Sequence, residues 1–250
     1  DKKAAGLESL PGGGAEVFSE RVQGNLFWTK ADSEEWLRIA ATAHRCGLPS
    51  NATMLYGHIE NTKEKVDHLC RLRGVQDETG GFLCYIPLSF HPERTELEHL
   101  PGPTGCLDLK EIAVGRLMLD NFPHVKTFWI MNTIEISQTA LWYGADDIDG
   151  TVMDYEITRR APDDTRQRLF AHPNISELGM LADAVRWRRH PEPVVTYNVG
   201  RNVNYTNVCW VKCDFCAFYR PPGSAEGYVL PREQIFAKID AVGAVGGEQP

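Results

Sequence analysis

The chain has 250 residues, 42% of them hydrophobic and 24% charged, which is typical of a soluble globular protein. Its formal net charge of −8 supplies no basic surface for nucleic acid or anionic lipid, so we expect neither partner. No apolar run approaches the roughly 18–20 residues that span a bilayer, and Asp1-Lys2-Lys3 leads into no signal-peptide core. We therefore expect a cytoplasmic protein without a membrane partner.

The seven cysteines are unevenly distributed along the chain. Cys46, Cys70, Cys84 and Cys106 stand singly, whereas the other three lie close together near residue 213. An odd number in this arrangement argues against a disulfide framework. It favours a reducing compartment and a metal site.

A glycine-rich run, Leu10 to Glu16, occupies the N-terminal region. Consecutive glycines let backbone amides approach a ligand closely, and the carboxylate beyond them can hold an amine or a hydroxyl. Gly13, Gly14 and Glu16 are therefore weak candidates for substrate binding, with a flexible turn as the alternative. Because no clear strand precedes the run, it is not a dinucleotide-binding fingerprint.

Apolar strands and amphipathic helices then alternate along the chain. The patterns predict helices that begin at Asp32, near Thr62, at Asp108 and at Ile136, the first and third opened by possible capping boxes. They predict strands over residues 52–56, 80–88, 125–131 and 145–151. This order indicates an α/β protein with a parallel sheet, and we predict a (β/α) barrel of the TIM type, at least in part.

In such barrels the reactive side chains collect where strands end. This rule places Gly57, Glu60, His91 and Asn132 on one face, together with the aspartates at 146, 147 and 149. The three aspartates suggest a divalent metal, although a solvated or helix-capping turn is the commoner explanation. His91 and Asp147 are weak candidates for substrate binding, and His58 and His91 can equally be structural histidines.

Residues 161–174 are charged, contain prolines and lack periodicity, so they predict a boundary or linker. Beyond it we expect an amphipathic helix that ends in the basic run 186–190, which suits the helix dipole without any nucleic acid. A β-rich segment at 194–199, the cysteine cluster and a helix over 231–242 follow. This is the order in which a barrel begins.

Cys209, Cys213 and Cys216 are separated by three and then two residues, a spacing that allows them to converge on one metal centre. Structural zinc needs a second knuckle, a ferredoxin needs a fourth nearby cysteine, and a thioredoxin-like pair leaves Cys209 unexplained. Three soft thiolates suit an iron–sulfur cluster with one open iron. Phe215, directly before the third cysteine, can pack against a planar ring.

The cysteine loop resembles that of the radical S-adenosylmethionine superfamily. The resemblance implies a metal-binding enzyme with a 4Fe-4S cluster, S-adenosyl-L-methionine on the open iron, cleavage to a 5′-deoxyadenosyl radical, and a flavodoxin or ferredoxin as reductant. Thr53 to Glu60 resembles a cofactor motif of the superfamily, in which Gly57 and Glu60 match. Gly246-Gly247-Glu248 spells another of its motifs, but it directly follows a helix and we interpret it as a helix cap.

Two related families account for the two parts of the chain. Residues 1–160 resemble the C-terminal half of aminofutalosine synthase in runs such as Ser50 to Glu60 and Gly144 to Thr151. Residues 175–250 resemble the N-terminus of cyclic dehypoxanthine futalosine synthase, in Asn202 to Arg220 and Glu226 to Leu230. We therefore predict the end of one radical enzyme barrel joined to the beginning of another, with the seam at 161–174. Joined in this order, the strand before the cysteine loop can lie beside the last strand of the first part.

The resemblance implies menaquinone biosynthesis by the futalosine pathway, with a small-molecule substrate that is either an enolpyruvyl benzoate or a futalosine-type nucleoside. Aminofutalosine synthesis is a transferase reaction, and dehypoxanthine futalosine cyclisation is the other reaction implied. A deazaflavin (FO) synthase-type radical enzyme remains an alternative. So does an inactive fragment that binds a cluster.

Overall fold

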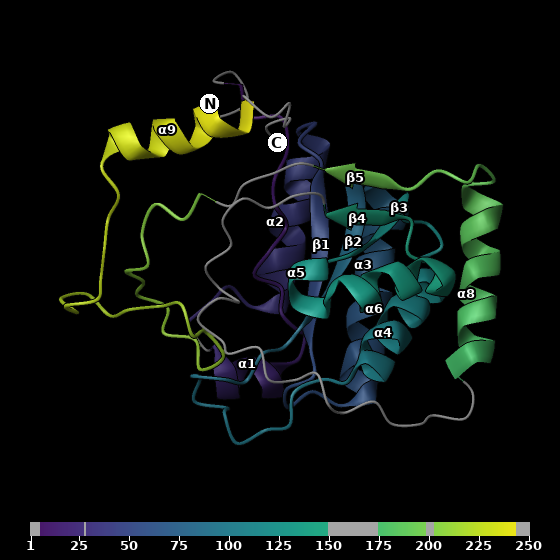
Figure 1. Cartoon of the computed structure of the whole chain (residues 1–250), viewed down its shortest axis with the longest axis horizontal. Coiled ribbons are helices and arrows are strands. Elements are labelled where there is room, and N and C mark those ends of the chain that lie inside the picture. The colour runs from purple at the N-terminus through teal and green to yellow at the C-terminus, as the bar shows by residue number, and fades with distance from the viewer. Residues whose placement is uncertain (1–5, 28, 150–174, 199–202, 244–250) are drawn as a thin grey trace.

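The computed structural model describes residues 6–27, 29–149, 175–198 and 203–243 (Figure 1). The predicted linker at 161–174 and the Gly246-Gly247-Glu248 motif lie outside these residues. The helices are α1 (Glu20–Leu26), α2 (Ser33–Arg45), α3 (Thr62–Thr79), α4 (Gly105–Met118), α5 (Trp129–Asn132), α6 (Ile134–Ala140), the 3-10 turn η1 (Leu141–Tyr143), α8 (Ile175–Arg189) and α9 (Arg232–Gly243). The strands are β1 (Ser50–Tyr56), β2 (Phe82–Ser89), β3 (His124–Thr127), β4 (Asp147–Asp149) and β5 (Thr196–Asn198).

The five strands form one sheet in the order β1-β2-β3-β4-β5, and every neighbouring pair is parallel. Sequential parallel strands with helices between them are the arrangement of a (β/α) barrel, here in part. The predicted α/β class is confirmed. The strand before the cysteine loop does pair with the last strand of the first part, Ile148 opposite Tyr197.

Strand β1 shows why the sheet is buried. Every residue from Ala52 to Tyr56 is buried, which requires cover on both faces of the sheet. Phe82 opens β2 and stacks on Phe122, with ring centroids 5.2 Å apart. The core thus follows the near-continuous apolar runs of the parallel strands.

Polar side chains begin helices α2 and α3, and the sequence pattern predicts the first of these caps, at Asp32, but not the second. Asp32 accepts a hydrogen bond from Glu35 N at 2.8 Å, and Asn61 with Glu64 forms a complete capping box on α3. The capping box predicted at Asp108 is wrong. Helix α4 is capped by Thr104, three residues before Leu107, and Asp108 is buried inside the fold.

The strand predicted over residues 125–131 is too long. Strand β3 ends at Thr127 and α5 begins at Trp129. A short apolar run fits a buried strand and a buried helix equally well, because neither leaves a polar face to define a period. The run therefore predicts burial without identifying the element.

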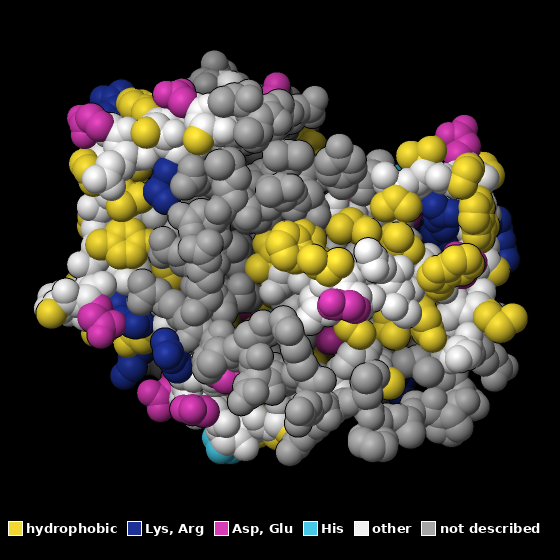
Figure 2. All heavy atoms as spheres, in the orientation of Figure 1, with side chains coloured by type: hydrophobic (Ala, Val, Ile, Leu, Met, Phe, Trp, Pro, Cys, Tyr) yellow, Lys and Arg dark blue, Asp and Glu magenta, His cyan; other side chains and the backbone are white. Residues whose placement is uncertain are grey.

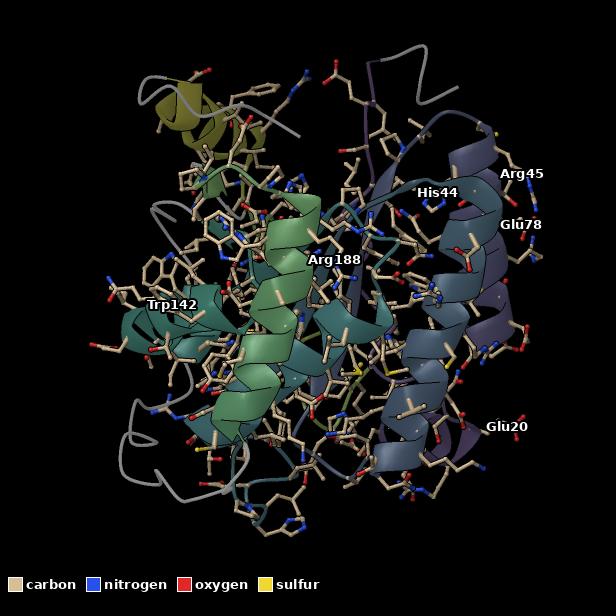
Figure 3. The ribbon with its side chains drawn as sticks, turned by 90° about the vertical axis from the view of Figure 1, so that its right-hand side faces the viewer. Glu20, His44, Arg45, Glu78, Trp142 and Arg188 are labelled. Atoms are coloured by element: carbon tan, nitrogen blue, oxygen red, sulfur yellow. The ribbon has the colours of Figure 1, made fainter. Side chains whose placement is uncertain are left out.

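Helix α8 and strand β5 belong to the same body as the first part of the chain, because β5 extends the sheet and α8 packs on its helices. Helix α8 packs against α4 and η1, at the side of the molecule opposite to α9 (Figures 1 and 3). Gly179 makes this contact possible, since a Cβ there would lie 2.5 Å from the ring of Tyr143. Within the basic run, Arg186 is buried and donates to Val194 O at 3.0 Å, so it connects α8 to the segment before β5.

None of the helices in the described ranges is both long and apolar enough to cross a membrane. Exposed hydrophobic side chains gather over α6, η1 and α8, and Figure 2 shows them on the face presented there. The most exposed of those on these elements are Ile134, Trp142 and Met180, and Trp142 points away from the molecule in Figure 3.

Candidate cluster-binding site

The cysteine loop is attached to the body of the protein by backbone hydrogen bonds. Asp214 N donates to Leu26 O at the end of α1, and Glu96 N, in the connection after β2, donates to Asp214 O, at 3.2 and 3.0 Å. The Thr29 hydroxyl donates to Val211 O at 2.8 Å. These contacts place the loop beside the edge at which β1 and β2 end, where a parallel sheet positions its reactive groups.

The loop is also closed on itself. Cys209 N donates to Arg220 O and Arg220 N to Asn207 O, while Cys216 N donates to Cys213 O, all within 3.1 Å. The three cysteines are half-buried, so each thiol is both held and accessible. The spacing in sequence is thus converted into a fixed turn that presents three sulfurs.

Lys30 and Glu16 form an ion pair beside this loop. Lys30 Nζ lies 2.5 Å from Glu16 Oε1 and 5.0 Å from the centre of the Phe215 ring. Phe215 in turn meets Phe27 edge to face, with centroids 6.0 Å apart. A cation, an anion and two aromatic rings therefore converge on the middle of the cysteine loop.

The ion pair acts electrostatically on Cys213. Burial raises the pKa of the Cys213 thiol to about 11, while Lys30 opposes this rise and Glu16 adds to it. Burial lowers the pKa of the Lys30 ammonium, but Glu16, by charge and hydrogen bond, raises it more, so the net change is upward. Lys30 remains a cation and is available to stabilise negative charge on the sulfurs.

Glu16 occupies an unusual backbone position. Its φ is +46°, in the left-handed region, and only 8% of the residue is exposed. Its carbonyl accepts a hydrogen bond from Leu55 N at 3.1 Å, so Glu16 lies beside the end of β1. A strained, buried, charged residue at a strand end is typical of functional sites.

The turn after β1 is organised by Glu60. Its carboxylate accepts from Gly57 N at 2.7 Å and from His58 N at 2.9 Å. Gly57 has φ +92°, and a Cβ there would lie 2.1 Å from Pro103, so glycine is required. Glu60 and Gly57 therefore shape one turn. Glu16 connects this turn to the cysteine loop, because it hydrogen-bonds Leu55 at the end of β1 and pairs with Lys30 beside the loop.

His58 in this turn is neutral. Ile59 N donates to its Nδ1 at 2.7 Å, and its Nε2 lies 3.0 Å from Leu55 O, which together define the Nε2–H tautomer. Burial lowers the pKa of His58, although Glu60 opposes this, and Glu16 also acts on it. Glu16 thus influences both His58 and Cys213.

The donor set suits an iron–sulfur cluster. Within the described part of the chain, the one group of three potential ligands whose donor atoms all lie within 4.8 Å of one another is His124, Asp146 and His190, away from the cysteines. The cysteine loop instead supplies three half-buried thiols from one short segment. Three soft thiolates are the ligand type and number that an iron–sulfur cluster with one open iron takes.

The other candidate residues have structural contacts or, for Gly14, a special backbone conformation. Gly13 O accepts from Trp36 Nε1 at 3.1 Å, and Gly14 adopts a positive φ of +86°. His91 Nε2 lies 3.1 Å from Met131 O. Asp147 pairs with Lys126 in the adjacent strand at 3.3 Å. Their role in substrate binding stays a prediction.

Of the three aspartates, the two whose side chains the structure describes have separate partners. Asp146 precedes β4 and is buried in a cluster of its own, whereas Asp147 faces Lys126; the Asp149 side chain lies outside the described structure. Lys30 is the residue that sequence reasoning missed at the cysteine loop. It belongs to no motif and lies more than 180 residues before Cys213 in the chain. The one signal in the sequence is an isolated positive charge three residues after the aromatic Phe27.

A parallel α/β sheet with a three-cysteine loop beside its strand ends is the arrangement expected of a radical S-adenosylmethionine enzyme. No family model matches the chain. It is 49% identical over 171 residues to an aminodeoxyfutalosine synthase of Thermus thermophilus, a match covering 67% of this chain and 46% of that protein. The corresponding enzyme of Streptomyces coelicolor is 43% identical over 192 residues, 73% of this chain and 48% of that protein.

A 5-amino-6-(D-ribitylamino)uracil–L-tyrosine 4-hydroxyphenyl transferase of Methanococcus maripaludis is 39% identical over 164 residues, 64% of this chain and 46% of that protein. The chain spans about half the length of the curated relatives that it matches. It is related by sequence to the aminodeoxyfutalosine synthases, as its resemblance predicts. The assignment of residues 175–250 to a second such enzyme stays a prediction.

Proposed function

We propose that the chain is part of a radical S-adenosylmethionine enzyme of the futalosine route to menaquinone, with aminodeoxyfutalosine synthesis as its reaction. The observation that carries this proposal is the 49% identity to an aminodeoxyfutalosine synthase over two thirds of the chain. A match of that extent cannot lie within residues 175–250, so it includes much of residues 1–160. The substrate class that follows is an enolpyruvyl benzoate ether.

Three cysteines, Cys209, Cys213 and Cys216, would hold the 4Fe-4S cluster. When bound, the cluster and S-adenosyl-L-methionine supply a 5′-deoxyadenosyl radical. Lys30 balances the negative charge of the thiolates, and the Phe27 and Phe215 rings limit the access of water. A flavodoxin or ferredoxin is the reductant that this chemistry needs.

The organisation of the chain follows from the same resemblance. Residues 1–160 are the C-terminal part of one barrel, residues 161–174 are a seam, and residues 175–250 begin a second barrel. A match to 64% of the chain is consistent with a first part of this extent, whereas the match to the Streptomyces coelicolor enzyme, at 73% of the chain, extends beyond residues 1–160. The pairing of β5 with β4 supports one continuous sheet across the seam.

A second reaction is favoured by a separate set of relatives. The tyrosine 4-hydroxyphenyl transferases are 37–39% identical over 164 residues, so a substrate pair of tyrosine and a ribitylaminouracil is the alternative. The higher identity to the aminodeoxyfutalosine synthases, 43% and 49%, places the futalosine reaction first.

Anaerobic reconstitution with iron and sulfide tests the cluster. We expect the chain to acquire iron–sulfur absorbance and, with dithionite and S-adenosyl-L-methionine, to release 5′-deoxyadenosine. Cys213→Ala should abolish both, whereas Cys70→Ala, which removes an exposed thiol on α3, should change neither. Equal cluster content in the Cys213 variant would refute the assignment.

The substrate is tested separately with the reconstituted protein. We expect the enolpyruvyl benzoate ether to be consumed with loss of carbon dioxide, and tyrosine with a ribitylaminouracil to be left unchanged. The reverse outcome would favour the transferase reaction. Release of 5′-deoxyadenosine without conversion of either substrate would indicate that this chain binds the cluster but performs no turnover on them.

A further inference from the structure

A second cluster of potential ligands lies at the opposite edge of the sheet. His124 begins β3, Asp146 directly precedes β4, and His190 follows α8. Parallel strands begin at one edge and end at the other, so this cluster and the cysteine loop lie at opposite edges. Nothing in the proposed radical chemistry uses these residues.

The three side chains converge on one carboxylate oxygen. Asp146 Oδ2 lies 3.0 Å from His124 Nδ1 and 2.8 Å from His190 Nε2. The two imidazole rings are stacked, with centroids 5.0 Å apart and planes inclined by 13°. All three donor atoms lie within 4.8 Å of one another.

The other oxygen of Asp146 is held by groups that orient the carboxylate. Arg116 donates to Asp146 Oδ1 at 2.5 Å and Val125 N donates to the same atom at 2.8 Å. Asp146 is only 3% exposed, and Arg116 is fully buried. Such supporting hydrogen bonds are typical of the residues around a metal ligand, because they fix its orientation before the ion arrives.

The side of the cluster away from Arg116 is open. A pocket of about 330 Å³ is lined by His124, Asp146 and His190 together with Arg189, Glu192 and Val194. Arg189 and Glu192 contribute one formal positive and one formal negative charge to this lining. Two imidazoles, one carboxylate and an open position are a donor set that zinc and similar ions prefer.

We propose that His124, Asp146 and His190 form a binding site for one divalent transition-metal ion of the zinc type. Around tetrahedral zinc, ligand atoms lie about 3.3 Å apart, so the two separations from Asp146 Oδ2, 3.0 and 2.8 Å, need to widen by only a few tenths of an ångström. The fourth position is left to water or to Glu192. The bound ion would link α8 to the strands before it.

Binding requires a change of tautomer at His190. In the metal-free protein, His190 Nε2 also lies 2.7 Å from Pro123 O, so this nitrogen carries a hydrogen that it donates to Pro123 or Asp146. A metal at Nε2 requires this hydrogen to move to Nδ1, which a neutral imidazole does without net release of a proton. The contact with Pro123 is then given up in favour of the ion.

Calorimetry with Zn²⁺ tests this site. The protein should carry Cys209→Ala, Cys213→Ala and Cys216→Ala, because the thiols at the opposite edge would otherwise bind the same ion. We expect one Zn²⁺ to bind per chain. His124→Gln or His190→Gln should weaken binding by at least the ~10–100-fold that the loss of a supporting residue costs.

The control is His99→Gln, which replaces an exposed histidine in the connection after β2 and should leave Zn²⁺ affinity unchanged. Circular dichroism without metal shows whether each variant is folded. A metal site is excluded if the folded parent binds no Zn²⁺, or if its affinity survives both replacements. The cluster would then be a hydrogen-bonded ion pair only.

Discussion

Cys213 is the cysteine of the loop whose pKa responds to charged side chains from the body of the protein. Its thiol is half-buried and packs against the core, and the charges of Lys30 and Glu16 act on it with opposite signs. A thiol in this setting is protonated near neutral pH until a metal replaces the proton. The ion pair therefore acts on the sulfur of the cysteine that packs against the core.

We predict opposite changes in the alkylation of Cys213 when the two charges are removed. Lys30→Met should raise the pKa of the thiol and Glu16→Gln should lower it, because the first removes a cation and the second an anion. At a pH below the pKa, lowering the pKa by about 1 raises the thiolate fraction roughly tenfold. The pH dependence of iodoacetamide labelling is followed on the Cys213 peptide by mass spectrometry. Its midpoint gives the pKa of the thiol, whatever the accessibility of the sulfur to the reagent.

Lys63→Met on the exposed side of α3 is the control for Lys30. Changes of equal sign in the Lys30 and Glu16 variants would contradict an electrostatic effect. They would indicate instead that both replacements merely open the loop.

Asp108 is a buried carboxyl group that the sequence suggests as a helix cap. It accepts hydrogen bonds from the Tyr56 hydroxyl at 2.6 Å and from Ser89 at 3.0 Å, which link β1, β2 and α4. Burial raises the pKa of Asp108 to about 6, from an ordinary value of 3.8, although these hydrogen bonds oppose the rise. The folded state therefore binds the proton more tightly than the unfolded state.

This difference predicts a dependence of stability on pH with a definite sign. The contribution of protonated Asp108 is complete below pH 3.8 and is lost as the pH rises through about 6. Between pH 4 and pH 7 the parent should therefore lose up to about 3 kcal/mol of unfolding free energy relative to Asp108→Asn. Urea unfolding at both pH values measures it, with Asp67→Asn on exposed α3 as the control; an equal loss in parent and Asp108 variant would contradict the prediction.

At the scale of elements, the turn after β1 depends on a glycine that no other residue can replace without strain. Gly57 combines a positive φ with a Cβ direction blocked by Pro103, while Gly74 lies on α3 with open space around it. The same substitution should therefore have opposite effects at the two positions.

Gly57→Ala should destabilise the protein by more than about 1–2 kcal/mol, since the left-handed backbone cost and the collision with Pro103 add. Gly74→Ala should stabilise it by up to about 1 kcal/mol, because it raises helix propensity in an exposed position. Thermal unfolding of both variants is the measurement. A neutral Gly57→Ala would show that the turn is able to relax and would contradict the requirement for glycine at position 57.

Local patterns predicted most elements and failed at identifiable places. The side chains of Asp32 and Asn61 meet backbone N–H groups three residues on, so a sequence window contains the whole interaction. The run Val125 to Met131 has no polar alternation, so its change from strand to helix after Thr127 is not encoded in a window. Thr104 rather than Asp108 begins α4 because the buried partners of Asp108, Tyr56 and Ser89, come from other elements.

At the scale of the whole molecule, the two parts predicted from sequence share one sheet and one helical layer. Strand β5 continues the sheet beyond β4, and α8 covers α4 and η1. Helix α9 lies apart from the sheet (Figure 1). The segment that continues to β5 therefore completes the first part, whichever enzyme it descends from.

Truncation distinguishes the contribution of α8 and β5 to stability from that of α9. A chain ending at Asp149 should melt at a lower temperature and self-associate, because it exposes the β4 edge and the face of α4 that α8 covers. A chain ending at Pro231, which lacks α9, should keep the melting temperature of the full chain. Calorimetry and size-exclusion chromatography measure both; equal stability of the chain ending at Asp149 would show that the two parts fold independently.

The sequence by itself determined the α/β class, the three-thiol spacing of Cys209, Cys213 and Cys216, and the relationship to the futalosine enzymes. The α/β class and the cysteine spacing depend on short stretches of sequence, and the relationship depends on overall sequence similarity. The tertiary structure decided that Lys30 and Glu16 meet the cysteine loop, and that His190 meets His124 and Asp146. Those contacts join residues far apart in the chain, and they exist only because parallel strands bring their ends to common edges.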